Sequence, residues 1–218
     1  MFIGHYGPAL AAKPLHKPIP LWLLFVAVQW MDFCWSLLVL AGIEKFRVVP
    51  GFTQGSPLDL YFMPYTHGLL GAGLLALGFG VVTALFFRER KGLVAAVLAG
   101  AVFSHWLLDL VVHVPDLPLW GDCLKVGFGL WRHVAVSLPL EELILLVGAW
   151  IYARSTPSRL GGKIALWSFV AAMAALQVYA NFGPPPADVR AEAVTALVAY
   201  TVLALLAGLV DGLRRPKM

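Results

Sequence analysis

The chain has 218 residues, of which 60% are hydrophobic and 13% are charged. An ordinary soluble domain has roughly 25% charged residues, so this composition, with a mean hydropathy of +0.81, excludes that class and indicates an integral membrane protein. The formal charge of +4 comes from basic residues in short clusters between apolar runs, which argues against a nucleic-acid partner. Two cysteines, Cys34 and Cys123, support neither a disulfide framework nor a thiolate metal site.

The apolar runs predict an all-α polytopic protein that forms one bundle over residues 1–218. The first apolar segment, residues 2–12, is too short to span and is expected to be a half-helix that lies on the inner surface or rises into the bundle. The start of the chain lacks the features of a cleaved signal, so we expect Met1 to be retained. About six transmembrane helices follow, at about residues 20–42, 61–87, 92–114, 129–153, 161–181 and 190–213.

The distribution of Lys and Arg predicts the orientation. The connections on one side of the predicted spans carry most of these residues, so the positive-inside rule predicts that both termini are cytoplasmic. The two long outer connections, residues 43–60 and 115–128, are rich in Pro, Gly and aromatics and are expected to cap a cavity that opens outward. The basic residues of the inner side are Lys13, Lys17, Arg88, Arg90, Lys91, Arg154, Arg159, Lys163, Arg214, Arg215 and Lys217.

Ionisable residues inside the predicted spans are candidates for a functional site, because burying one in a membrane costs several kcal/mol unless it is paired. His105, Asp109 and His113 repeat every four residues, so they share one face of one helix. With a rise of ~1.5 Å per residue, Asp32 lies about 18 Å and His67 and His105 lie about 21 Å above the inner side. Three helices therefore bring side chains to one depth.

Imidazole nitrogens with carboxylate oxygens are typical ligands of zinc, and also of manganese or iron. Asp32, His67, His105 and Asp109 suffice for one ion. His5, with His113 or a shared carboxylate, can supply a second. A hydrogen-bonded polar seam between helices remains the alternative to a metal site.

Further residues are assigned around this centre. Glu141 and Glu142 point about 100° apart, so at most one of them faces the site. Periodicity favours Glu141, as a water-activating base or an extra ligand, with a purely structural contact as the alternative. Candidate substrate-binding residues are Tyr65 and Thr66 beside His67, and Arg132 and His133 near the outer mouth, where they can meet an anionic head group.

Several motifs in roughly residues 1 to 120 resemble the membrane-bound, LexA-regulated inner-membrane hydrolase-like proteins, which are distantly similar to zinc-dependent phospholipase C. The resemblance implies a bacterial inner-membrane location and a zinc held by Asp32, His67, His105 and Asp109, with His5 on another. This sequence departs from that pattern in having a lone Asp32 and in the stretch before His67. The matching motifs are Gly4-His5, Asp32, Tyr65-Thr66-His67, and Ser104-His105 followed by Asp109 and Pro115-Asp116-Leu117-Pro118.

These observations predict a membrane-embedded metal-dependent hydrolase. It would act on a lipid or lipid-linked ester, phosphoester or amide through a metal-activated water. The alternatives are a metal- or proton-coupled transporter that uses the same His/Asp cluster, and a structural metal site. Polar residues rise toward the outside and are few in the inner half, which favours an outward cavity over a through-pathway. The expected partners are membrane lipids and an amphiphilic substrate, and no oligomeric state is predicted.

Overall fold

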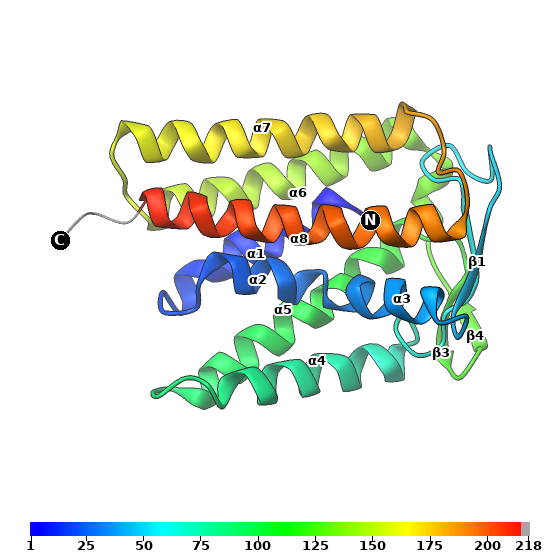
Figure 1. Ribbon diagram of the computed structural model, residues 1–218, viewed down its shortest axis with the longest axis horizontal. Coiled ribbons are helices and arrows are strands. Elements are labelled where there is room, and N and C mark those ends of the chain that lie inside the picture. The colour runs from blue at the N-terminus through cyan, green and yellow to red at the C-terminus, as the bar shows by residue number, and fades with distance from the viewer. Residues whose placement is uncertain (215–218) are drawn as a thin grey trace.

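The computed structural model describes residues 1–214 as a bundle of helices with two small hairpins at one end (Figure 1). The predicted all-α class is confirmed. The helices are α1 (Tyr6–Ala12), α2 (Leu21–Val28), α3 (Trp30–Leu40), α4 (Leu69–Ala84), α5 (Lys91–Val112), α6 (Val134–Ser155), α7 (Leu160–Phe182) and α8 (Val189–Arg214). The shorter elements are the 3-10 turns η1 (Ile3–His5), η2 (Lys13–Leu15) and η3 (Leu130–Arg132), and the strands β1 (Lys45–Val48), β2 (Leu58–Phe62), β3 (Leu117–Trp120) and β4 (Cys123–Val126).

Four of the helices within residues 1–214, α5 to α8, are long and apolar enough to cross a membrane. The pair α2 and α3 passes the same criterion together, as a fifth span bent by 53°. Helix α4 is shorter, at 16 residues, because residues 61 and 62 belong to β2 and residues 63–68 form a turn. An integral membrane protein is therefore indicated, but the predicted count of six spans is not confirmed.

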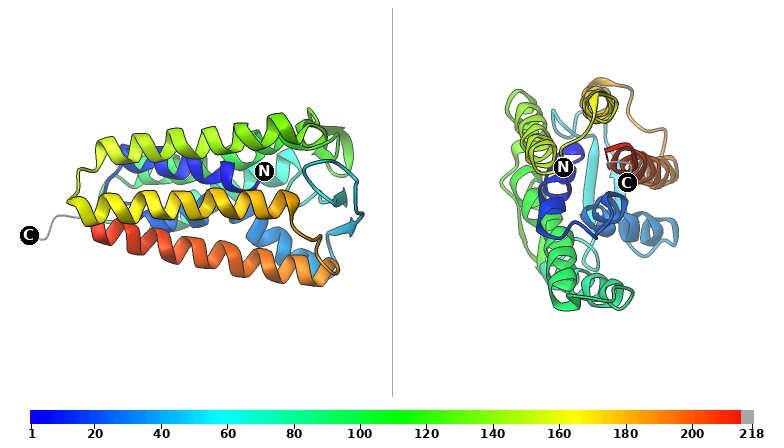
Figure 2. Two further views of the ribbon diagram at one scale, coloured as in Figure 1. Left: turned by 90° about the horizontal axis from the view of Figure 1, so that it is seen from above. Right: turned by 90° about the vertical axis from the view of Figure 1, so that its left-hand side faces the viewer.

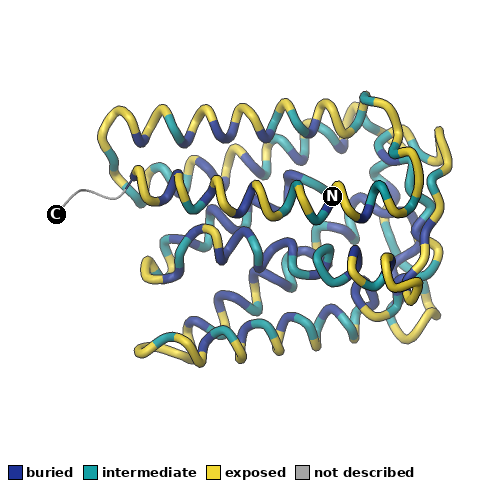
Figure 3. Tube along the Cα trace, in the orientation of Figure 1, coloured by how far each residue is buried: buried dark blue, intermediate teal, exposed yellow. Residues whose placement is uncertain are grey.

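The outward faces of the long helices are strongly apolar, and exposed residues run along α4 and α7 in Figure 3. Soluble monomers rarely expose large continuous apolar patches, so these faces suit contact with lipid. The exposed side chains include Leu74, Leu77 and Val81 on α4, Leu143 and Trp150 on α6, Ile164 on α7, and Val198, Leu205 and Leu209 on α8.

The N-terminal segment lies inside this ring of longer helices, as the end-on view in Figure 2 shows. Tyr6, Ala9 and Leu10 are almost completely buried. Helix α1 packs against α6 at two glycines: a Cβ on Gly148 would lie 2.2 Å from the carbonyl oxygen of Gly7. Small residues allow such close approach of backbones in membranes. Of the two predicted positions for this half-helix, the structure has the buried one.

Helices α4 and α5 form the expected hairpin, connected by residues 85–90. Their backbones also approach closely, since a Cβ on Gly80 would lie 2.5 Å from the carbonyl oxygen of Ala95. This pairing fixes α5, the helix that carries three of the predicted ligands.

The two long outer connections contain the hairpins β1–β2 and β3–β4, which the amino-acid pattern did not predict. Both hairpins lie at the end of the bundle opposite to the last residues of α8 (Figure 1). A separate apolar cluster packs beneath them, formed by Trp35, Val39, Phe46, Leu60, Met63, Leu117 and Ala193. The connections are therefore packed onto this end of the bundle.

The α1–α6 crossing gives a stability prediction. Gly148→Ala places a methyl group against the backbone of Gly7, so we expect a loss of about 1 to 3 kcal/mol in the free energy of unfolding, the usual cost of overpacking. Unfolding of the purified protein in detergent, followed by circular dichroism against denaturant, measures this loss. The matched control is Gly78→Ala on α4, where the added methyl meets open space. Equal stability of the two variants would contradict this account of the crossing.

Candidate metal centre

Five of the predicted ligands converge inside the bundle from four chain segments. His5 belongs to η1, Asp32 to α3, His67 to the turn before α4, and His105 and Asp109 to α5. The side chains of His5, His67, His105 and Asp109 are at most 4% exposed, and that of Asp32 is 13% exposed. Asp32, His67 and His105, which the sequence predicts to lie at one depth, are therefore close together in the structure.

The imidazoles surround the two carboxylates. His105 Nε2 lies 3.0 Å from Asp109 Oδ2 and 3.4 Å from Asp32 Oδ1. His67 Nε2 lies 3.2 Å from Asp32 Oδ1 and 3.6 Å from Asp109 Oδ2. His5 Nε2 lies 3.1 Å from Asp109 Oδ1. Two overlapping groups result, Asp32–His67–His105 and His5–His105–Asp109, and the donor atoms of each lie within 4.8 Å of one another.

The other ring nitrogen, Nδ1, is occupied in three of the histidines. His105 Nδ1 donates to the carbonyl oxygen of Val28 at 2.7 Å. His113 Nδ1 lies 2.9 Å from Asp116 Oδ1. His67 Nδ1 lies 2.9 Å from the Thr66 hydroxyl, which donates its own hydrogen to Glu44 Oε2 and therefore accepts from the ring. In a neutral ring, this arrangement leaves the Nε2 lone pair directed inward, as in histidines that bind metals.

These lone pairs face carboxylate oxygens, so either a proton on Nε2 or a metal ion must lie between each ring and the carboxylate to avoid repulsion. Within residues 1–214, His105 Nε2 and both ring nitrogens of His5 are buried and make no well-aligned hydrogen bond, although His105 Nε2 and His5 Nε2 lie within 3.1 Å of the Asp109 oxygens. The His5 and His105 rings stack in parallel, with centroids 3.7 Å apart, beside the same carboxylate. The donor set of imidazole nitrogens and carboxylate oxygens fits zinc, manganese or iron.

The amino group of Met1 lies close to one of these oxygens, 2.5 Å from Asp109 Oδ1. This oxygen is therefore already contacted by the backbone nitrogen of Met1. Asp109 Oδ2 and Asp32 Oδ1 instead face the imidazoles of His67 and His105. Asp32, His67 and His105 thus form one group that could hold a metal ion.

The break between α2 and α3 shapes the site. Gln29, at the break, has φ −106° and ψ 7°, and the preceding carbonyl of Val28 accepts the hydrogen bond from His105 Nδ1. The break also starts α3 at Trp30, two residues before Asp32. Irregular backbone at membrane depth is tolerated only where it is buried in protein or lines a cavity, and Gln29 is fully buried.

Glu44 holds the turn that carries His67. Its Oε1 accepts hydrogen bonds from the backbone N–H groups of Tyr65 and Thr66, at 2.8 and 3.0 Å. Thr66 is 1% exposed and lies behind His67, so it orients the ring. Of the two predicted substrate-binding residues beside His67, Thr66 is buried and Tyr65 is 56% exposed at the surface.

Glu141 and Glu142 differ as the helical periodicity predicts: Glu141 is 1% exposed and Glu142 is partly exposed. Glu141 Oε2 accepts hydrogen bonds from the backbone N–H of Phe2 at 2.8 Å and of Gly4 at 3.5 Å. This carboxylate therefore fixes the segment that carries His5.

The remaining predicted residues lie at the outer side of the cluster. His113 Nε2 is 3.6 Å from Asp109 Oδ1, and the Trp131 ring covers His113 at a centroid distance of 4.3 Å. Arg132 and His133, next in the chain, are exposed.

Sequence reasoning missed the residues that hold the ligands. The spacing of Asp116, three residues after His113, is a signal that was present in the sequence. The Val28 carbonyl contacts His105, and the Tyr200 hydroxyl donates to Asp32 Oδ2 at 2.9 Å. Glu44 acts through Thr66, which bonds His67. These partners lie far apart in the chain and left no such signal.

A scan against protein-family models gave no match, and searches of curated protein sequences and of solved structures gave none either. The resemblance carried by the sequence motifs therefore stays a prediction, and the geometry of the site is the basis for assigning a function.

The Glu44–Thr66–His67 arrangement gives a second prediction. Thr66→Val keeps the shape of the side chain but removes the hydroxyl that orients His67. We expect metal affinity to fall by roughly 10- to 100-fold, as when such orienting partners are removed elsewhere. Titration of the purified protein against a chromogenic chelator measures the affinity. The control is Thr201→Val, whose exposed hydroxyl bonds only within α8, to the Leu197 carbonyl, among the contacts of residues 1–214. Unchanged affinity in Thr66→Val would remove His67 from the ligand set.

Proposed function

We propose that this chain is a membrane-embedded, metal-dependent hydrolase that acts on a lipid or lipid-linked ester or phosphoester. One observation carries the proposal: buried imidazole Nε2 atoms converge on the Asp32 and Asp109 carboxylates, while the opposite nitrogens of His67 and His105 are held by oxygen acceptors. That pattern is expected of metal ligands, and it is not needed for a seam that only holds helices together.

Asp32, His67, His105 and Asp109 would hold one divalent ion, with zinc preferred, and His5, with His113 or the shared Asp109 carboxylate, would hold a second. When bound, such an ion polarises the scissile oxygen and makes water nucleophilic near neutral pH. The chain's own residues do the rest: Tyr200 orients Asp32, the Val28 carbonyl orients His105, and the apolar core around α1 excludes bulk water. Because Glu141 is occupied by the backbone of Phe2, we assign it to positioning His5 and not to proton transfer.

The side from which the cluster is accessible supports a lipid-like substrate. Asp32 is the most exposed of the five ligands, and its carboxylate is bound by Tyr200 on α8, so the approach runs along the α3 and α8 side. Exposed apolar side chains on both helices, such as Leu37 and Val198, would accompany an acyl chain. Arg132 and His133, exposed at the start of α6, would meet a head group. We place this reaction in a bacterial inner membrane, with the basic end of the bundle cytoplasmic.

A metal- or proton-coupled transporter is the second candidate, because the inner half of the bundle has a buried polar cluster that the sequence pattern did not predict. Lys13 Nζ lies 3.2 Å from Asp211, which also accepts a hydrogen bond from the Tyr152 hydroxyl at 2.9 Å. Between this cluster and His5, however, α1 contributes the buried apolar residues Ala9 and Leu10. Such an apolar layer favours a closed catalytic site over a continuous path.

The proposal predicts the outcome of elemental analysis. Purified wild-type protein should carry stoichiometric zinc or manganese per chain, and His105→Ala and Asp109→Ala should each lose it, because each removes a ligand atom from the centre. His16→Ala, which lies outside the cluster on the inner connection, should keep the wild-type content. A wild-type protein that is folded yet free of metal under metal-replete conditions would refute the hydrolase mechanism.

Turnover separates the two candidates. Hydrolysis of lipid phosphoesters in mixed micelles should require the metal, stop on chelation and be absent in Asp109→Ala. If instead metal-loaded wild-type protein in liposomes hydrolyses none of a panel of lipid esters and phosphoesters but carries zinc across the bilayer, the transporter replaces the hydrolase.

A further inference from the structure

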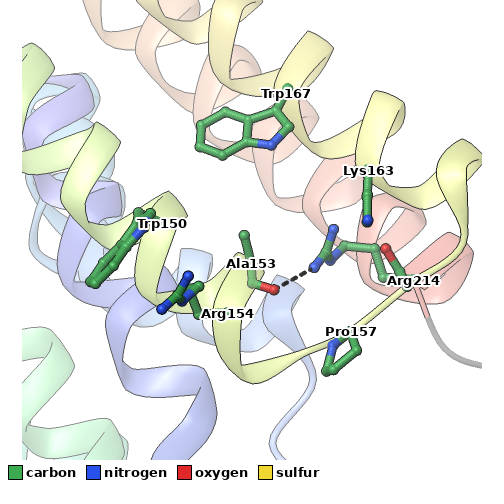
Figure 4. Close-up of a pocket in the computed structure, with 8 residues that line it drawn as sticks. Trp150, Ala153, Arg154, Pro157, Lys163, Trp167 and Arg214 are labelled. Carbon is green, nitrogen blue, oxygen red and sulfur yellow. Dashed lines mark hydrogen bonds between the residues drawn. The ribbon is translucent and has the colours of Figure 1, made fainter.

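A cavity of about 440 Å³ lies at the basic end of the bundle, between the end of α6, the start of α7 and the end of α8 (Figure 4). Its side chains are of two kinds. Trp150 and Trp167 form apolar walls, and Arg154, Lys163 and Arg214 supply positive charge. Within residues 1–214, no acidic side chain lines it.

The cavity contains buried donors that lack a partner. Arg214 is 4% exposed, and its terminal nitrogens bond to carbonyl oxygens at the end of α6 and to Gly162, yet its Nε has no hydrogen-bond partner in the described part of the chain. The Ser158 hydroxyl is buried and likewise unpartnered among residues 1–214. Both residues line the cavity, and the two unpartnered atoms lie just beneath its surface, covered by neighbouring atoms.

The residues that line the cavity are typical of the membrane depth where lipid head groups meet the hydrocarbon core. The Trp150 and Trp167 side chains are 55% and 42% exposed, and the Arg154 guanidinium lies over the Trp150 ring at 5.3 Å. Tryptophan is typical of this boundary, and basic pockets between transmembrane helices on the cytoplasmic side attract anionic head groups. Lys163 and Arg154 are exposed, so they are free to reach a ligand from the membrane.

We propose that this cavity binds the phosphate of an anionic phospholipid. Arg154 and Lys163, both exposed, neutralise the phosphate, the buried Arg214 adds positive charge beneath it, and the two tryptophans flank the glycerol and the upper acyl chains. Free inorganic phosphate offers the same oxygen chemistry, but it makes no use of the exposed apolar walls. The lipid is therefore the assigned ligand.

This site is separate from the candidate metal centre. Its residues lie at the inner ends of α6, α7 and α8, whereas His105 lies fourteen residues above the inner end of α5, a rise of about 21 Å. Lipid binding and metal content are thus independent measurements.

Native mass spectrometry of the purified full chain in detergent tests the proposal. Phosphatidylglycerol, phosphatidylcholine with the same acyl chains, and inorganic phosphate are titrated separately, and the fraction of protein carrying each is measured. The test variant is Arg154→Gln with Lys163→Gln. The control, Arg88→Gln with Arg90→Gln, removes two cations from the connection between α4 and α5 at the same end of the bundle.

We expect phosphatidylglycerol to bind the wild type more tightly than phosphatidylcholine, and the Arg154/Lys163 variant to lose about 10- to 30-fold in affinity, since each nearby cation contributes to attraction of an anionic head group. The control should bind as the wild type does. The proposal is overturned if the control loses as much affinity, because the attraction is then a property of the whole basic surface. It is also overturned if both lipids bind equally, or if inorganic phosphate binds as tightly as the lipid.

Discussion

The structure depends on keeping the carboxylates of Asp32 and Asp109 inside a membrane domain. An uncompensated charge there costs several kcal/mol, so positive or metal partners must surround it. Four histidines lie within 3.6 Å of these carboxylate oxygens. The helices outside this centre bring ligands to it or exclude water from it, and the outer hairpins pack over its upper side.

Two irregular elements serve this constraint. The break between α2 and α3 exposes the Val28 carbonyl to His105, and the N-terminal half-helix enters the bundle to deliver His5. A regular six-helix bundle would provide neither. Neighbouring polar side chains hold the N-terminal segment. Glu141 and Gln177 accept hydrogen bonds from the backbone N–H groups of Phe2 and Ile3, which have no partner within η1. The polar groups of the site and the irregular backbone therefore stabilise each other.

Much of the ligand set could be predicted from sequence because a helix has a fixed rise and period. His105 and Asp109 had to share a face, and Asp32, His67 and His105 had to share a depth. The second span could not be bounded correctly, since Tyr61 and Phe62 are apolar enough for a helix but pair with β1 as a strand. The contacts of Glu44 and Tyr200 depend on how the helices pack around one another, which periodicity does not encode.

The glycine crossing of α1 and α6 has a consequence for biogenesis. Gly7 leaves the ribosome long before Gly148, and at 5–20 residues per second the delay is about 7 to 30 seconds. During this interval the half-helix has no α6 to pack against, and it is too short to span the bilayer by itself. The contacts with α6, including the hydrogen bonds from Phe2 and Gly4 to Glu141, can therefore form only after α6 has been synthesised, so the segment around His5 is fixed late although it is made first.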